Sequence, residues 1–493
     1  MDKNTQARAF RNAGILTATQ IISKILGAVF VLVVARRLSV ADYGLYVFGG
    51  VFGTLFGMVV AFGIPRLITR TVARDLDATA KTLGSTLLIE AILLIVMHVA
   101  MVAILLSLGY PERRAWIVGI MGSGAMLIAV YSVNYAFFRA HQRMELEAPI
   151  SISQSAANMF LGIAVLVAGF GILGLVLVQW GVYALTVAAS LLVILWKLGR
   201  PSFSPNWRPH RDLLVMAWPF ALSSVFVYLY QGMDVILLSF LKGDQATGLL
   251  AGAKNFVMIF GVLSIGLVGA FLPVLSRAAK DSAGLWLNTL QRLTKYLLVI
   301  ALPICVGLSL VSGELVPLVL GDQYSGSALI LQFLAFFIPL SFLNSGLSCG
   351  LISRGSEKTL MRILGIIVII SAGSQLALIS LWGAYGAAAA LLFTEGVMLL
   401  SQLVVLRRCG QRLPILRIAL RPILSVAVMA LGVFFVRGLG LIPAVLTGAV
   451  IYVVALFALQ TFAIDEREAL RLVWEAALAR LTWRSRHKPA GPV

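Results

Sequence analysis

Residues 14–35 read GILTATQIISKILGAVFVLVVA, an apolar run long enough to cross a bilayer as a helix. Lys24 lies near the middle of this run, roughly 15 Å from either end at 1.5 Å rise per residue. A lysine side chain cannot reach that far to water. The run therefore predicts a membrane-spanning helix whose central charge either pairs with another residue or belongs to a functional site.

The rest of the chain has the same apolar character. Of its 493 residues, 60% are hydrophobic and 12% are charged, whereas soluble domains carry about 25% charged residues. The chain is therefore expected to be an all-α polytopic membrane protein with about 14 transmembrane helices, since a crossing needs about 20 residues. The predicted spans lie near residues 14–35, 43–64, 83–108, 115–138, 149–169, 173–196, 213–240, 246–275, 296–312, 326–350, 361–381, 384–406, 421–437 and 441–463.

The charge distribution predicts the topology. The formal net charge is +19, and most of the 39 Lys and Arg residues fall in the loops on one side of the predicted spans. The positive-inside rule then places both termini in the cytoplasm. The basic excess also favours contact with anionic membrane lipids, so we expect no nucleic-acid partner. The three cysteines are far apart and form no metal motif, and no cofactor is expected.

A faint internal repeat relates the first six spans to the next six. Similar residues recur in the same order at offsets between 204 and 215, and they pair Gly44 with Gly248, Pro65 with Pro273, Arg70 with Arg277, Arg139 with Arg354, and Gly171 with Gly383. Two parallel six-helix repeats predict two lobes around a central cavity, with two further helices at the C-terminal end. The expected parts are an N-terminal lobe (1–200), a C-terminal lobe (201–410), spans 13 and 14 (411–464) and a cytoplasmic amphipathic tail (465–493). Chance recurrence of loop residues is the alternative.

Four further charged residues lie away from the ends of the predicted spans, in addition to Lys24. Asp234 and Lys254 lie at similar distances from a predicted turn near Gly243, so they can form an ion pair or a switch that substrate breaks. Glu395, near mid-span, is a candidate for coupling to protons or sodium, and Glu90 fits either a solvated vestibule or a coupling role. Lys24 either pairs with Glu90 or Glu395 or faces a cavity that takes an anionic headgroup.

The second predicted span contains glycines at a regular spacing. Gly49, Gly53 and Gly57 recur every four residues. This small-xxx-small spacing predicts close helix packing.

The opening of the chain resembles a known group. Ser23-Lys24-x-Leu26-Gly27, then Ala35-Arg36 and Asp42-Tyr43-Gly44-Leu45-Tyr46, are similar to the start of the polysaccharide-biosynthesis (O-antigen and exopolysaccharide) flippases of the multidrug/oligosaccharidyl-lipid/polysaccharide exporter superfamily.

The resemblance implies a flippase of the inner membrane and not an enzyme. Its substrate would be an undecaprenyl-diphosphate-linked oligosaccharide, and a polysaccharide polymerase and other proteins of the pathway would be its partners. Lys24, Lys254 and Arg36 would be the cavity cations that bind the diphosphate. Phe30 stands where the related lipid II flippases carry an arginine, so this cavity would be less positive.

Two other classes of membrane protein are alternatives to a flippase. A multidrug or cation antiporter of the same superfamily shares the twelve-span core, but its coupling chemistry resembles an acidic residue in the first span, where this chain has Lys24. A membrane enzyme of the same pathway would use a motif such as D-x-D, which residues 75–77 contain. That triplet lies in a short loop with no nucleotide-binding fold around it, so a solvated loop is expected instead.

Overall fold

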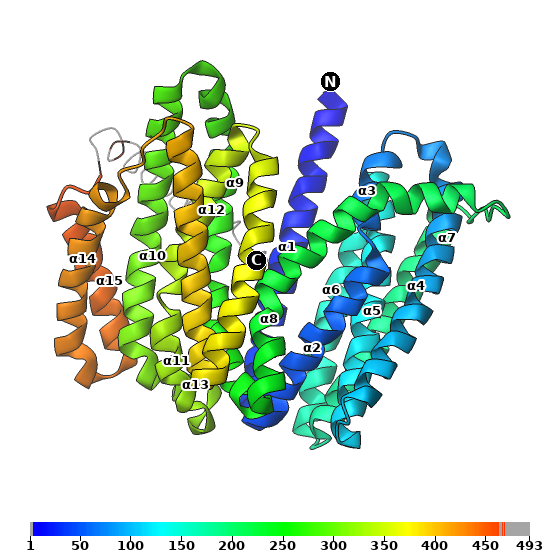
Figure 1. Ribbon diagram of the computed structural model, residues 1–493, viewed down its shortest axis with the longest axis horizontal. Helices are drawn as coiled ribbons and strands as arrows, with labels where there is room; N and C mark the ends of the chain where they lie inside the picture. Colours follow the sequence, from blue (N-terminus) through cyan, green and yellow to red (C-terminus); the bar gives the residue numbers. More distant parts are fainter. Residues whose placement is uncertain (1–2, 463–465, 467, 469–493) are drawn as a thin grey trace, which may run out of the picture. The chain divides into compact units, whose positions relative to one another are not determined.

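The computed structural model describes residues 3–462 together with Glu466 and Glu468, and it describes side chains from Gly14 onward. Every regular element in these residues is a helix, as the composition predicted (Figure 1). The first half of the chain forms α1 (Lys3–Arg37), α2 (Val40–Ala61), α3 (Ile64–Thr71), η1 (Leu76–Ala78), α4 (Thr79–Ser107), α5 (Glu112–Ala140), α6 (Met144–Val167), α7 (Gly171–Lys197) and α8 (Arg208–Ile259).

The second half continues the helical pattern. Its elements are α9 (Gly261–Asp281), α10 (Ala283–Leu320), η2 (Asp322–Tyr324), α11 (Gly326–Leu334), α12 (Phe337–Ser353), α13 (Glu357–Arg408), α14 (Ile415–Val436), η3 (Arg437–Leu439) and α15 (Leu441–Ala458). The predicted amphipathic tail over 465–493 lies outside the described residues, apart from Glu466 and Glu468.

Twelve helices in the described part of the chain are long and apolar enough to cross a membrane. Two of the elements, α8 and α13, each run for 52 residues and contain one glycine outside helical geometry. These are Gly243 (φ 81°) and Gly383 (φ 57°), at the two places where the sequence predicts turns. Positive φ is readily adopted only by glycine, so the chain can change direction there. Each of these two elements is thus two helices joined at a kink, which falls between predicted spans 7 and 8 in α8 and between spans 11 and 12 in α13. The count of fourteen crossings stays a prediction.

The chain divides into two compact units. The first contains Met1–Val262, Ser312–Phe337 and Ser356–Gln402, and the second contains Leu263–Val311, Ile338–Gly355 and the residues from Leu403 onward. Each unit therefore draws on separate parts of the sequence. The lobe boundaries expected near residues 200 and 410 stay predictions.

In the first unit, α2 packs against both α5 and α8 (Figure 1). The three glycines of the second predicted span make the contact with α5. A Cβ atom on Gly53 would lie 2.5 Å from Gly122 Cα, and one on Gly57 would lie 2.7 Å from the Ala125 carbonyl oxygen. Gly49 is similarly close to the side chain of Met121. The predicted packing role of these glycines is confirmed.

At its N-terminal end, α2 crosses the part of α8 that follows Gly243. A Cβ on Gly44 would lie 1.8 Å from the carbonyl oxygen of Asp244, and a Cβ on Gly248 would lie 2.0 Å from the carbonyl oxygen of Val40. Gly44 and Gly248 were paired by the predicted repeat, and Val40 and Asp244 are separated by the same 204 residues. The contact is thus reciprocal between positions that the repeat makes equivalent.

The second unit has its own packing. α14 and α15 lie side by side (Figure 1) and share a core that includes Met429, Val433 and Tyr452. On α10, the indole of the buried Trp286 donates a hydrogen bond to Ser353 Oγ at 2.9 Å, and Arg354 covers its ring.

Candidate functional site

Lys24 lies on α1, where the sequence places it within an apolar helix. Its side chain is exposed and has no hydrogen bond or ion pair with any residue that the structure describes. The two salt bridges considered for it, with Glu90 and with Glu395, are therefore not formed in this part of the chain. A charge on an apolar helix without a protein partner is available to a ligand.

Lys254 and Asp234 meet across the break in α8. Lys254 Nζ lies 2.7 Å from Asp234 Oδ2 and donates a second bond of 3.0 Å to the carbonyl oxygen of Gln231. The Asp234 side chain is 1% exposed and that of Lys254 is 16% exposed. The other carboxylate oxygen, Asp234 Oδ1, is buried with no hydrogen-bond partner among the described residues. The ion pair that their similar spacing from Gly243 suggested is present in the structure.

Glu395 lies close to the same stretch of α8. The side chain is buried on α13, and Tyr230 donates a 2.7 Å hydrogen bond to its Oε1. Tyr230 stands four residues before Asp234, a spacing that puts both side chains on one face of α8. The structure thus forms two polar pairs, Asp234 with Lys254 and Tyr230 with Glu395, whose α8 members stand one helical turn apart. We call these four residues the polar cluster.

Among the described residues, Glu90 and Arg36 make no hydrogen bond or ion pair with the polar cluster. Glu90 on α4 is buried, and neither of its carboxylate oxygens has a hydrogen-bond partner in the described part of the chain. Because the side chain is only 3% exposed, the residues that the structure describes leave no solvated vestibule around it. Burying an ionised carboxylate without a partner is costly. Arg36 is exposed near the end of α1 and donates to the Leu318 carbonyl oxygen at 3.4 Å. It lies twelve residues from Lys24, about 18 Å along the helix, so the two cations are not neighbours.

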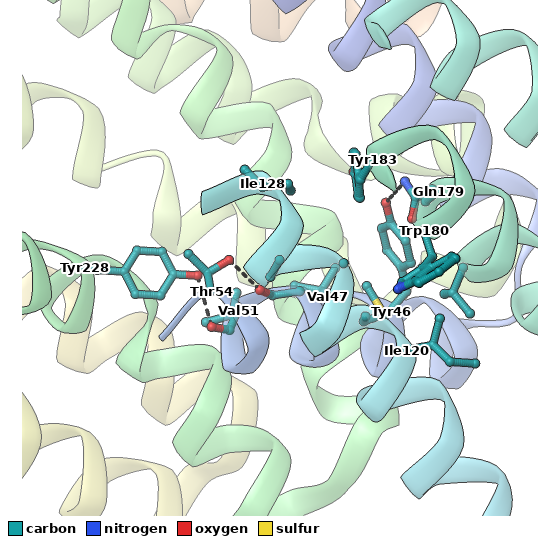
Figure 2. A pocket seen from close by; sticks show the side chains of 15 residues that line it. Tyr46, Val47, Val51, Thr54, Ile120, Ile128, Gln179, Trp180, Tyr183 and Tyr228 are labelled. Carbon is teal, nitrogen blue, oxygen red and sulfur yellow. Dashed lines mark hydrogen bonds between the residues drawn. The ribbon is translucent and has the colours of Figure 1, made fainter. Parts of the chain in front are cut away.

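A cavity of about 320 Å³ lies among α2, α5, α7 and α8. We call it the aromatic cavity, because its lining includes Tyr46, Trp180, Tyr183 and Tyr228. Figure 2 shows Tyr46, Trp180, Tyr183 and the amide of Gln179 gathered at one end and Tyr228 at the other. Sequence reasoning missed this cavity, since its lining comes from four helices with no common spacing.

Hydrogen bonds hold several of these side chains in place. Gln179 Nε2 donates to the Tyr46 hydroxyl at 2.9 Å, and the Tyr228 hydroxyl donates to the Val51 carbonyl oxygen at 3.1 Å (Figure 2). Trp180 stays 42% exposed. The cavity is therefore built from fixed polar groups with an indole at its rim.

A second cavity of about 270 Å³ adjoins the first. The two share Thr54, Ala125 and Ile128 in their linings, and the second extends to Arg66 on α3. Arg66 is exposed and makes no hydrogen bond or ion pair with the residues that the structure describes.

The fold is shared with solved transporters. A structure of the lipid II flippase MurJ in an inward closed conformation matches with a TM-score of 0.73 at 14% identity, covering 89% of this chain and 97% of that one. An inward-facing multidrug resistance MATE family transporter of the MOP superfamily matches with a TM-score of 0.64 at 15% identity, covering 81% and 99%. At these identities the likeness concerns the fold alone.

The sequence relatives are also named for transport or for polysaccharide biosynthesis. The lipid II flippase MurJ of Bacillus subtilis (strain 168) is 23% identical over 457 residues, covering 82% of this chain and 83% of the relative. A protein of Shigella dysenteriae described as an O-antigen transporter is 30% identical over 189 residues, which are 38% of this chain. The capsular polysaccharide biosynthesis protein CapF of Staphylococcus aureus is 26% identical over 202 residues, which are 40% of this chain. The matches to these last two span 47% and 50% of their length.

One protein family matches the first part of the chain. Residues 9–279, more than half of its length, match the family described as polysaccharide biosynthesis protein. This range contains most of α1, with Lys24, and all of α2 to α8, with the Asp234–Lys254 pair and the aromatic cavity. The family suggested by the opening motif is therefore confirmed, and the chain belongs to the polysaccharide biosynthesis protein family, with an all-helical fold that it shares with the solved MurJ and MATE structures.

Proposed function

We propose that this protein is a flippase that moves an undecaprenyl-diphosphate-linked oligosaccharide from the cytoplasmic to the periplasmic leaflet of the inner membrane. Movement would occur by alternating access, for O-antigen or exopolysaccharide synthesis. The observation that carries the proposal is Lys24, a cation on an apolar helix that has no partner among the described residues. The relatives named for O-antigen transport and capsular polysaccharide biosynthesis support the same substrate class.

The chemistry of the substrate explains why such a cation is useful. A diphosphate cannot cross hydrocarbon unaided, because an isolated buried charge costs many kcal/mol. An ammonium group in a cavity replaces part of its hydration. The membrane potential, negative inside, then assists outward movement of negative charge by about 2.3 kcal/mol per charge per 100 mV.

Lys254 would act differently from Lys24. Its ammonium is already neutralised by Asp234, so it can engage an anionic headgroup only when that ion pair opens or is shared. We propose that the pair is an internal switch and that Lys24 is the first contact of the diphosphate. Arg36, near the end of α1, would contact the substrate at a different depth.

The arrangement of the halves is part of the same proposal. Two six-helix lobes would alternate around a central cavity, with α14 and α15 outside the repeat and both termini in the cytoplasm. A polysaccharide polymerase of the pathway would take the product on the periplasmic side.

Lipid analysis of cells tests the function. Lipids would be extracted from a deletion strain and from strains carrying only Lys24→Ala, Lys24→Arg or Lys81→Ala, and examined by mass spectrometry for undecaprenyl-diphosphate oligosaccharide. We expect the oligosaccharide lipid to accumulate in the deletion and Lys24→Ala strains. Lys24→Arg keeps the charge, and Lys81 is an exposed cation at the start of α4, so neither of these strains should accumulate it.

The other outcomes separate the alternatives. Accumulation in the deletion strain alone makes Lys24 structural. No accumulation in any strain contradicts the flippase proposal and favours the antiporter, for which raised sensitivity of the deletion strain to cationic dyes is the confirming result. The first span argues against the antiporter, because it carries Lys24 where an antiporter of the superfamily would couple through an acidic residue, and Asp234 is already neutralised by Lys254.

A further inference from the structure

We propose that the aromatic cavity binds sugar residues of the lipid-linked glycan, apart from the cations that take its diphosphate. This inference rests on the proposed flippase function, and it adds a subsite for the neutral part of the substrate.

The charge of the lining argues against a diphosphate in this cavity. Fifteen described residues line the cavity, and none of them is acidic or basic. A diphosphate would need a cation or a set of aligned donors, and an organic cation would have only aromatic faces to contact, with no carboxylate to neutralise it. A neutral ligand with both apolar and hydroxyl surfaces suits this lining.

The chemical groups of the lining match a sugar ring. Aromatic faces such as that of Trp180 offer flat apolar platforms for the C–H groups of a pyranose, while phenol, amide and indole groups supply donors and acceptors for its hydroxyls. The Trp180 indole N–H makes no hydrogen bond within the described residues, so it is free to donate. The volume of about 320 Å³ falls at the lower end of ligand pockets, ~300–1,000 Å³, which limits the occupant to a short part of the glycan.

Several polar groups of the cavity are already held in place by hydrogen bonds within the protein. The bonds from Gln179 to Tyr46 and from Tyr228 to the backbone of Val51 fix the polar groups. Groups that are already ordered lose little conformational freedom on binding, which favours affinity.

The position of the cavity suits a path across the membrane. Its lining on α2 begins at Tyr46, and the adjoining second cavity continues along α2 to Ala61. These residues are separated by about 22 Å along the helix, most of the hydrocarbon thickness of ~30 Å. The unpartnered Arg66 stands at the far end of this row. The second cavity is lined mainly by apolar residues and offers the hydroxyls of Thr54, Ser132 and Ser224. The sugar-binding groups are therefore concentrated in the aromatic cavity.

Binding of two lipids to the full-length protein in lipid nanodiscs tests the inference. One is undecaprenyl-diphosphate oligosaccharide extracted from the cells that make this protein, and the other is undecaprenyl diphosphate without sugar. We expect the wild type to prefer the glycosylated lipid. Trp180→Ala should lower this preference about tenfold, an effect of the size expected for loss of an aromatic contact, with binding of the bare lipid unchanged. Trp180→Phe keeps a stacking face and should retain most of the preference.

The control is Trp116→Ala, because Trp116 is an exposed tryptophan on α5 that does not line the cavity. It should leave both affinities unchanged. A wild type without preference for the glycosylated lipid overturns the inference, as does a Trp180→Ala variant that keeps the preference or loses both lipids equally. Failure of the flippase proposal looks different, because the wild type then binds neither lipid. Binding of the bare lipid that Lys24→Ala leaves unchanged would contradict only the role proposed for Lys24.

Discussion

At the scale of single residues, the Asp234–Lys254 pair makes a prediction about stability. Lys254→Met would leave the carboxylate of Asp234, whose side chain is 1% exposed, without its counter-charge. We expect a loss of about 3–5 kcal/mol in the free energy of unfolding, the usual cost of breaking one side of a buried pair. Asp234→Asn combined with Lys254→Met removes the stranded charge and should recover most of that loss. Unfolding of the purified variants in mixed micelles measures both, and a double variant as unstable as the single one would contradict the prediction.

The residues that sequence analysis could identify are those whose chemistry is unusual for their surroundings. Lys24 is recognisable because a charge inside an apolar run is costly. The proximity of Asp234 and Lys254 is predictable because they lie at similar distances from Gly243. The bond from Tyr230 to Glu395 joins α8 to α13, and the aromatic cavity takes its lining from four helices. Tyrosine and tryptophan are common in membrane helices, so no local signal marks the few that line a cavity.

At the scale of the helices, the contact between α2 and α5 makes a second prediction. Gly53→Ala would place a methyl group 2.5 Å from the backbone of Gly122, and backbone cannot move aside as a side chain can. We expect a loss of about 1–3 kcal/mol in the free energy of unfolding, as for other overpacked sites.

Gly50→Ala is the matched control on the same helix. Its added methyl group would meet only the end of the Met121 side chain, at 3.6 Å, and alanine favours a helix over glycine by up to about 1 kcal/mol. The control should be neutral or stabilising in the same unfolding measurement. Equal effects at both glycines would show that the α2–α5 spacing is less strict than the structure indicates.

The helices themselves were predictable because the hydropathy of a membrane helix is a property of the local sequence. The glycine spacing in α2 also predicted close packing correctly. The sequence separated spans 7 and 8 and spans 11 and 12, and in the structure the chain leaves helical geometry between them at Gly243, within 208–259, and at Gly383, within 357–408. How sharply the chain turns at a glycine depends on the neighbouring helices, and hydropathy carries no information about them.

At the scale of the whole molecule, the crossing of α2 and α8 predicts a thermodynamic coupling. Gly44→Ala and Gly248→Ala would each force a Cβ against a backbone carbonyl of the opposite helix. Each should cost about 1–3 kcal/mol. Once one methyl group has separated the helices, the second meets less resistance, so the double variant should be less destabilised than the sum of the singles by at least about 0.5 kcal/mol. Strictly additive values in the same unfolding measurement would mean that the two glycines do not share one contact.

The reciprocity of that crossing bears on how such a chain could arise. Gly44 meets Asp244 and Gly248 meets Val40, the pattern in which two identical subunits touch across a twofold axis. If the predicted repeat arose by duplication, a half-length ancestor that dimerised through this surface would have needed only one glycine, because a single position would have supplied both sides of the contact. After fusion the two sides would be separate codons, each kept by selection on its own. The two glycines would then be the remnant of a subunit interface, enclosed within one polypeptide.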